Sequence, residues 1–444
     1  MNPKYLEAIE TASTILAEAI LNDMEEALSY GAGLDRTVQH LTDAIGQDTL
    51  TLVYASISSH LTQQRQQEGW QIEHHPTVIF KTLFGPVAVD SPYLQKPGEA
   101  GGVRPMRQIM GVEGNRYSEA VERALVDFGS EKSFERAARQ FREHYGWEVE
   151  RGTVLRRTES VALSSQQYIQ ERLFSDPMSP EGASAAIETA FVVELDGCDI
   201  RTGMFMSAAE AGFTQRAPDE LVRPIQWQEV RTGLVRPLDE NTKRYVCLKG
   251  SYPQVCEQLF ALATGQGVTP DTLVLSPGDG GIGLQEELAR HFTNFQYILD
   301  LGHLKSHFYD TADKLGIEQK LQHGWVDGFI DQLWQNDVQG VLQSLQALFE
   351  KTKHDRLRCL INHLKRFAAA VDYGRFQENG WPIGSGEVES AHRYVPQERM
   401  KIPGAIWHPD TVNPMLALRV IRANDWWDDF WQWLHNERFQ QMAA

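Results

Sequence analysis

The chain lacks paired cysteines, long apolar runs and an excess of basic residues. Its four cysteines lie far apart in 444 residues without a CxxC spacing, which argues against a zinc ribbon or a disulfide framework. No segment approaches the roughly 20 unbroken apolar residues of a membrane-spanning helix. The first residues carry acids where a targeting leader carries bases. We therefore expect a cytoplasmic protein with no membrane partner.

The net charge of −18 argues against a uniformly basic nucleic-acid-binding protein, because phosphate binding usually requires a basic surface. The acidity is uneven, however, since Lys4 and Arg36 are the only basic residues among the first fifty. A local basic patch elsewhere remains compatible with nucleic-acid binding. The apolar content of 42%, with 11 Trp and 19 Phe, is sufficient for several cores and predicts a multidomain protein.

Residues 1–75 predict a helical region, because apolar residues such as Ile9, Leu16 and Ile20 recur three and four positions apart. This region is a candidate for self-association. From residue 78, β-branched and aromatic residues surround a Gly-Pro turn and predict a β-hairpin that ends near residue 95.

The β-hairpin and the helices after it form the second predicted region, residues 76–185. Ser133 is a candidate cap for a helix that ends near Gly146, and a second helix is expected to begin near Gly152. Two helices joined by a short turn are typical of a helix-turn-helix, but also of ordinary helical hairpins. In the first case the second helix presents basic side chains to DNA: Arg151, Arg156 and Arg157.

From residue 186 the pattern changes from helices to strands. Apolar and β-branched stretches predict five strands, and two helices separate the later ones. The strands are expected at 191–197, 224–235, 244–250, 272–279 and 294–300, and the helices at 252–264 and 284–292. This order predicts an α/β core of the ribonuclease-H-like type over residues 186–303, in a protein that is α+β overall.

Residues 304–378 have helical periodicity and almost no strand signal, so we expect an all-α insertion there. The last core helix is expected in residues 379–444. It starts near Gly386 and is kinked or interrupted by Pro396, and a tryptophan-rich pair of helices follows it.

Three acidic side chains lie beside small residues at the predicted edges of elements. They are Asp196 in LDG, Asp279 in GDGG and Glu389 in GSGEVES. Carboxylate oxygens that leave positions for water suit Mg2+ or Mn2+. A single Asp before Gly is more often a turn former, so the prediction rests on the three motifs together. Glu387 competes with Glu389, and on a helix the two point about 200° apart, so only one can face the site.

The motifs together resemble a known family. The ordered set comprises LDG at Asp196, WQEVRTGLV at 227–235, GDGG at Asp279, ILDLGH at 298–303 and PIGSGEVESAHRYVPQERMKIPGAIW at 382–407. It resembles the DDE transposases of bacterial insertion sequences, in particular the ISKra group, and is more distantly similar to Mutator-like transposases. The resemblance implies a ribonuclease-H-like domain with an all-α insertion, which uses Mg2+ or Mn2+ for DNA cleavage and strand transfer at transposon ends. It assigns Asp196, Asp279 and Glu389 as catalytic metal ligands and favours Glu389 over Glu387.

The resemblance also suggests supporting residues and partners. Asp300 and His303 match a motif of an acid, two residues and a His, and are expected to support the ligands, although Asp300 competes with Asp279 as the second acid. Basic and aromatic residues near Glu389 are candidates for DNA contact: His392, Arg393, Arg399, Lys401 and Trp407. Solvated surface charge is the alternative for the basic residues, and a core position is the favoured alternative for Trp407. The expected partners are the double-stranded DNA of terminal repeats and target, with a homodimer or larger assembly near the nucleoid. Related sequences often have a Cys pair after the β-hairpin, and this chain has none there.

Two other functions remain open. Gly278, Gly280 and Gly283 in GDGGIG fit the GxGxxG pattern of a dinucleotide-binding turn, and Asp300 follows at the spacing of a ribose ligand, as in nicotinamide-dependent oxidoreductases. Against this, the charge of Asp279 would repel a pyrophosphate at that turn. The other alternative is a domesticated, DNA-binding descendant of a transposase that has lost its activity.

Overall fold

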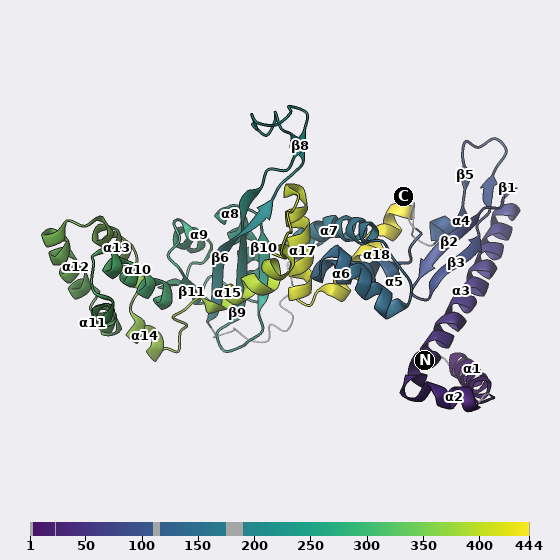
Figure 1. Ribbon diagram of the computed structural model, residues 1–444, viewed down its shortest axis with the longest axis horizontal. Coiled ribbons are helices and arrows are strands. Elements are labelled where there is room, and N and C mark those ends of the chain that lie inside the picture. Colours follow the sequence, from purple (N-terminus) through teal and green to yellow (C-terminus); the bar gives the residue numbers. More distant parts are fainter. Residues whose placement is uncertain (1–2, 23, 110–115, 175–189, 444) are drawn as a thin grey trace. The chain divides into compact units, whose positions relative to one another are not determined.

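The computed structural model describes residues 3–22, 24–109, 116–174 and 190–443. The chain forms two compact units (Figure 1). The first contains the described residues up to Phe128, residues 138–150 and residues 438–443, and the second contains residues 129–137, 151–174 and 190–437. Helices and a mixed sheet make up the structure, which confirms the predicted α/β class with an α+β character overall. Among the described helices, none is both long and apolar enough to cross a membrane.

The first unit begins with three helices, as the periodicity of residues 1–75 predicts. These are α1 (Pro3–Leu21), α2 (Met24–Tyr30) and the long α3 (Leu34–Gln67). Farther along α3, Leu50, Tyr54 and Ile57 pack against a hairpin of β2 (Thr77–Thr82) and β3 (Gly85–Asp90). The predicted β-hairpin is therefore confirmed, and its buried face covers the C-terminal half of α3.

A second small sheet in this unit was not predicted. It has the order β1-β4-β5, with β1 (Gln71–His74), β4 (Tyr93–Gln95) and β5 (Gly102–Val103). Helices α4 (Pro105–Ile109) and α5 (Glu119–Glu131) follow. These strands are very short, and β5 lies in a glycine-rich stretch that reads as a loop from its sequence.

The predicted pair of helices is present as α6 (Phe134–Tyr145) and α7 (Arg151–Phe174). One face of α7 is buried, with Val154, Val161 and Ile169 among its apolar side chains. It packs against α17 (Val412–Ala423), where the hydroxyl of Ser165 donates to the carbonyl of Pro414 at 3.3 Å. Helix α7 is thus part of the core of the second unit, and a DNA-reading role for it remains a prediction.

The central sheet of the second unit has five strands in the order β10-β9-β6-β11-β12. The bounds are β6 (Phe191–Thr202), β9 (Gln226–Pro237), β10 (Arg244–Leu248), β11 (Val274–Gly278) and β12 (Phe295–Leu299). The first three are antiparallel to their neighbours, whereas β11 runs parallel to both β6 and β12. Helices α8 (Tyr252–Gly265) and α9 (Leu284–His291) lie between the later strands in the chain. All five predicted strands and both helices are confirmed in their order.

The sequence predicts that strand β6 ends near Asp196, but in the structure the strand is longer. It continues to Thr202 and pairs residue by residue with β9 along its whole length. Its parallel pairing with β11 involves only Phe191 and Val192. Asp196 is therefore paired with β9 on one edge of β6. On the other edge it lies beyond the two residues that pair with β11. The ribbon extends into a small, unpredicted hairpin of β7 (Met206–Ser207) and β8 (Leu221–Val222), which Figure 1 shows projecting from the sheet.

Helices cover both faces of this sheet. Helix α8 packs closely on one face, where a Cβ atom at Gly233 would lie 2.8 Å from Leu259. On the other face Val388 and Ala391 of α15 (Gly386–His392) pack against Leu234 of β9. A sheet buried on both faces explains why its strands read as nearly continuous apolar runs.

The predicted all-α insertion is present after β12. It consists of α10 (Leu301–Lys314), α11 (Gln319–Trp334), α12 (Val338–Thr352), α13 (Asp355–Arg366) and α14 (Tyr373–Glu378). Its core contains Phe308, Val326 and Leu360 and is continuous with Tyr297 and Leu299 of β12. The insertion is therefore packed onto the edge of the sheet.

The helix that follows the insertion runs through Pro396 without a break. Helix α15 continues into a π-helical turn, η3 (Arg393–Gln397), and then into α16 (Glu398–Met400). Two carbonyl oxygens of this turn accept hydrogen bonds from Arg419 of α17: that of Val395, at 3.0 Å, and that of Tyr394. The last helix is α18 (Trp427–Ala443). Its buried Trp431 supports the predicted packing role of the tryptophans.

Candidate active site

Asp196 and Asp279 lie at the same level of two neighbouring strands. Phe191 of β6 is paired in parallel with Val274 of β11, and each acid comes five residues after its paired residue. Both acids are half-buried. Burial raises the pKa of Asp196, the Gly197 amide and nearby imidazoles lower it, and the charge of Asp279 raises it. The net rise in the pKa of Asp196 follows mainly from its partial desolvation, and the negative charge of Asp279 adds to it.

The glycines of the GDGG motif have structural roles around Asp279. The side chain of Asp279 accepts a hydrogen bond from the Gly281 amide at 2.8 Å, and the Gly280 amide donates to the Tyr297 hydroxyl at 3.1 Å. A Cβ atom at Gly278 would lie 2.4 Å from that hydroxyl, and Gly280 has a φ of +84°, which favours glycine. The motif therefore folds a tight turn over Tyr297 and presents Asp279.

Helix α15 separates the roles of Glu387 and Glu389. Glu387 is bound by Arg236 at 2.6 Å and by Lys243 at 2.8 Å. Burial tends to raise the pKa of Glu387, but these two cations lower it overall. The side chain of Glu389 is 59% exposed and contacts His303 instead. Glu387 is thus part of a structural ion pair, and Glu389 is the acid of this helix that is available to a ligand.

The start of α15 is fixed by a buried acid. Glu194, two residues before Asp196 on β6, accepts a hydrogen bond from the Val388 amide at 2.8 Å. Burial raises the pKa of Glu194 to about 8. This contact joins the strand that carries Asp196 to the helix that carries Glu389.

Two imidazoles link the acids. His392 of α15 is buried, and its ring nitrogens lie 3.0 Å from the Asp196 carbonyl oxygen and 3.6 Å from the Asp196 carboxylate. His303 of α10 lies 3.4 Å from Glu389 and also lowers the pKa of Asp196 by its charge. Acids from β6, from the turn after β11 and from α15 therefore face one region, with an imidazole beside each end of the set.

Asp300 positions these elements and has no oxygen without a partner. One oxygen caps α10 by accepting from the His303 amide at 2.7 Å. The other accepts from the amide and hydroxyl of Ser385 at 2.6 and 2.9 Å. Asp300 thus joins the start of the helix of His303 to the loop before α15. This placement agrees with a supporting role and argues against Asp300 as the second acid.

The structure corrects part of the predicted DNA-binding set. Arg399 is 3% exposed, its guanidinium lies over the rings of Phe134 and Trp407, and it donates to the Gly129 carbonyl at 2.9 Å. Trp407 is also buried and donates to the Met400 carbonyl at 3.1 Å. Arg399 and Trp407 are therefore core residues and are not available to DNA in this structure. His392 is buried as well, and it contacts Asp196 instead of a phosphate.

The other basic residues of that set remain candidates for DNA contact. Arg393 is exposed, with its nearest acid, Glu398, at 3.7 Å. Arg151, Arg156 and Lys401 are also exposed, whereas Arg157 is half-buried. The structure places Arg151, Arg156, Arg393 and Lys401 on the surface.

The donor chemistry of the site fits a hard divalent cation. Asp196, Asp279 and Glu389 offer carboxylate oxygens, the ligands that Mg2+ and Mn2+ prefer, and the repulsion between the first two would be offset by a bound cation. Among the described residues, however, no group of three or more His, Cys, Asp or Glu side chains is arranged to hold a metal ion. The acids are gathered, but they do not form a ready-made cage.

Sequence reasoning missed two histidines beside Asp279. The rings of His307 on α10 and His363 on α13 lie 4.8 Å apart, and a Cβ atom at Gly280 would lie 2.8 Å from His363. His307 had a signal, because it lies four residues after His303 on the same helical face. His363 had none, because only the fold brings α13 to the Asp279 turn.

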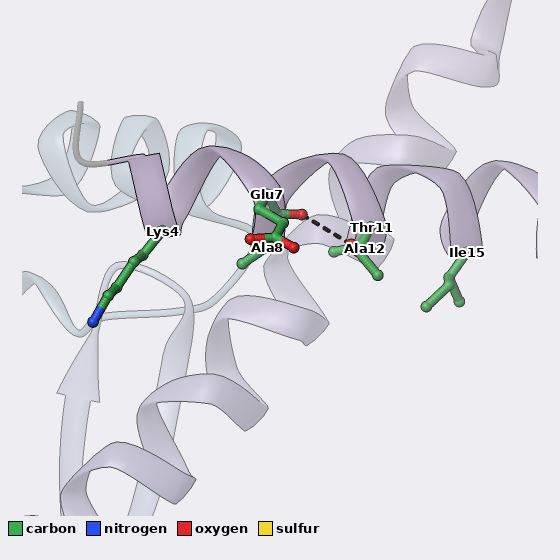
Figure 2. A pocket seen from close by; sticks show the side chains of 6 residues that line it. All are labelled: Lys4, Glu7, Ala8, Thr11, Ala12 and Ile15. Atoms are coloured by element: carbon green, nitrogen blue, oxygen red, sulfur yellow. Dashed lines mark hydrogen bonds between the residues drawn. The ribbon is translucent and has the colours of Figure 1, made fainter.

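A surface hollow in the first unit is unrelated to these acids. It lies along α1, and Figure 2 shows the side chains that line it: Lys4, Glu7, Ala8, Thr11, Ala12 and Ile15. The Thr11 hydroxyl donates to the Glu7 carbonyl within the helix at 2.9 Å. Most of the lining side chains are small or apolar, and Glu7 is the one acid among them. This set offers no arrangement for catalysis.

Comparison with known proteins adds no family. No protein-family model matches the chain, and no curated protein sequence is significantly similar to it. The resemblance to DDE transposases therefore depends on the motifs around Asp196, Asp279 and Glu389 and on the geometry of the residues that carry them.

Proposed function

We propose that this protein is a DDE-type transposase, a metal-dependent enzyme that cleaves DNA at the ends of an insertion sequence and joins those ends to target DNA. The observation that carries the proposal is the charge interaction of Asp196 with Asp279 and with His303, the histidine that contacts Glu389. The proposed substrate is double-stranded DNA. Two chains or more would hold the two transposon ends.

The sheet supports the finer fold assignment within this proposal. In a ribonuclease-H-like core the first three strands are antiparallel. The fourth strand lies beside the first, the fifth lies beside the fourth, and both run parallel to the first. The order β10-β9-β6-β11-β12 has this arrangement. It brings the acid on the first core strand beside the acid that follows the fourth.

In the proposed mechanism the protein gathers charge and fixes orientation. Asp196, Asp279 and Glu389 would hold Mg2+ or Mn2+, which when bound would polarise the scissile phosphate and ease deprotonation of the attacking water or 3′-hydroxyl. His392 keeps Asp196 in place. Asp300 keeps His303 and the start of α15 in place. Because Glu389 contacts His303, the proposal requires Glu389 to leave that contact when it becomes a ligand.

The nicotinamide alternative loses its support. The glycines of GDGGIG are explained by Tyr297 and by the turn at Asp279, and Asp300 is occupied by His303 and Ser385. A classic dinucleotide-binding sheet is mostly parallel, whereas three of the five strands here form an antiparallel ribbon.

A cleavage assay tests the proposal. The protein is incubated with Mg2+ or Mn2+ and a duplex that contains the DNA flanking its reading frame, and nicks are mapped. Asp196→Asn, Asp279→Asn and Glu389→Gln should each lower the rate about a thousandfold or more. Asp300→Asn should leave residual activity, lower by about 10- to 100-fold.

A matched control is Glu398→Gln, an exposed acid on the same helical run, which should cleave like the wild type. If Asp300→Asn abolished cleavage while Asp279→Asn retained it, the assignment of the second acid would be wrong. A wild-type protein that binds the duplex but never nicks it would instead be an inactive, DNA-binding descendant.

A further inference from the structure

The helical insertion brings two histidines to the acids that the proposed reaction does not use. His307 lies on α10 and His363 on α13, and their rings are inclined by 50° with centroids 4.8 Å apart. We propose that this imidazole pair binds a phosphate oxygen of the DNA strand that enters the carboxylate site. The inference rests on the proposed function and identifies the chemical group that this part of the site would recognise.

The pair adjoins the Asp279 turn. The ring of His363 is in contact distance of Gly280, since a Cβ atom there would lie 2.8 Å from the ring. His363 also packs against Phe367, with ring centroids 5.0 Å apart, and His307 follows His303 by one helical turn. A ligand at this pair would therefore lie next to the catalytic acids.

The ring nitrogens of the pair lack protein partners. Nε2 of His363 is buried and accepts or donates no hydrogen bond. Among the described residues, neither ring nitrogen of His307 makes one either. A buried polar atom without a partner is destabilising, and such atoms in native proteins call for an explanation such as a bound water or ligand. This applies to Nε2 of His363, and the neighbouring His307 ring is exposed and open to a ligand.

Charges of both signs act on this position: Arg356 and Arg366, which are paired with Asp310 and Glu286, and the carboxylate of Asp279. Burial lowers the pKa of His307 and lowers that of His363 to about 4, and the charges of Arg356 and Arg366 contribute. The imidazoles are therefore neutral near pH 7, and each has one N–H to donate. An N–H on each ring can donate to a phosphate oxygen.

A methylphosphonate scan tests this site. Full-length protein is titrated in EDTA with a duplex that contains the DNA flanking its reading frame and a nick at the cleavage position. A set of duplexes carries one uncharged methylphosphonate at successive positions around the nick. The variants are His307→Phe, His363→Phe and the double variant, because Phe keeps the ring packing and removes the nitrogens.

We expect the double variant to bind the unmodified duplex about five- to tenfold more weakly than the wild type. One methylphosphonate position should weaken wild-type binding by a similar factor and have no further effect on the double variant. His323→Phe is the matched control, because His323 is 78% exposed on α11 and contacts Asp327 and Tyr309 instead. It should bind like the wild type at every position.

The opposite results are clear-cut. If the double variant and the wild type had the same methylphosphonate profile, the pair would be a packing element and the inference would be overturned, while the proposed function would stand. If the wild type neither preferred the flanking duplex over a scrambled one nor nicked it with Mg2+, the proposed function would itself fail. If His363→Phe did not fold, His307→Phe would carry the same test, because His307 is exposed.

Discussion

Asp300→Ala should be among the most damaging single substitutions that leave the three proposed metal ligands intact. The side chain is buried and accepts three hydrogen bonds, from the His303 amide and from the amide and hydroxyl of Ser385. Loss of a helix cap costs about 1 kcal/mol. Each buried donor of Ser385 left without an acceptor costs about 1–3 kcal/mol. We expect the free energy of unfolding to fall by roughly 3–7 kcal/mol in total.

Asp337→Ala provides a matched control. Asp337 caps α12 by accepting from the Gly340 amide at 2.8 Å, but it is exposed and makes no second contact of this kind. Its loss should cost only about 1 kcal/mol. Urea unfolding followed by tryptophan fluorescence would measure both variants. Equal losses for Asp300→Ala and Asp337→Ala would refute the argument that Asp300 holds two elements together.

A double-mutant cycle makes this prediction sharper. Ser385→Ala removes the hydroxyl donor, so Asp300→Ala in that background leaves only one buried donor of residue 385 unsatisfied. The cost of Asp300→Ala should therefore be about 1–3 kcal/mol smaller than in the wild type. Additive losses would mean that the hydroxyl contact contributes nothing to stability.

Two further predictions concern buried charges. The raised pKa of Glu194, about 8, means that folding favours its protonated form. The free energy of unfolding should therefore fall as the pH rises from 4.5 to 8, by up to about 1.4 kcal/mol per pH unit. Glu194→Gln should flatten this slope in urea titrations with EDTA. Arg419 is 2% exposed and binds Glu131 and the carbonyls of the π-helical turn. Arg419→Met should cost about 3–5 kcal/mol by the same measurement, whereas the exposed Arg393→Met should stay within about 0.5 kcal/mol of the wild type.

Much of the second unit could be predicted because its signals are local. The strands of the central sheet are short apolar runs, and the insertion has helical periodicity over four long segments. The end of β6 could not be predicted, because LDG reads as a turn. Only the pairing of residues 197–202 with β9 keeps that segment extended. The hairpin of β7 and β8 was missed because its strands have two residues each.

The candidate site shows the same division. Asp196 and Asp279 were identified from their neighbours in the sequence, but the separation of Glu387 from Glu389 depends on Arg236, which is 151 residues away from Glu387. The burial of Arg399 depends on Phe134, which lies in a distant helix. From the sequence alone, a basic residue such as Arg399 is predicted to lie on the surface. The neighbouring residues in the sequence do not indicate the aromatic rings that cover it in the fold.

The imidazoles explain how three acids can be gathered before a cation binds. Asp196 and Asp279 repel each other in a half-buried site, and this repulsion opposes folding. His392 and His303 offset part of it, one through a buried contact with Asp196 and the other from an exposed position beside Glu389. The buried contact fixes the strand acid, whereas the exposed one leaves Glu389 able to exchange partners. In the proposed enzyme, the rigid part of the site is therefore the strand pair with the anchored start of α15, and the adjustable part is the exposed side chain of Glu389.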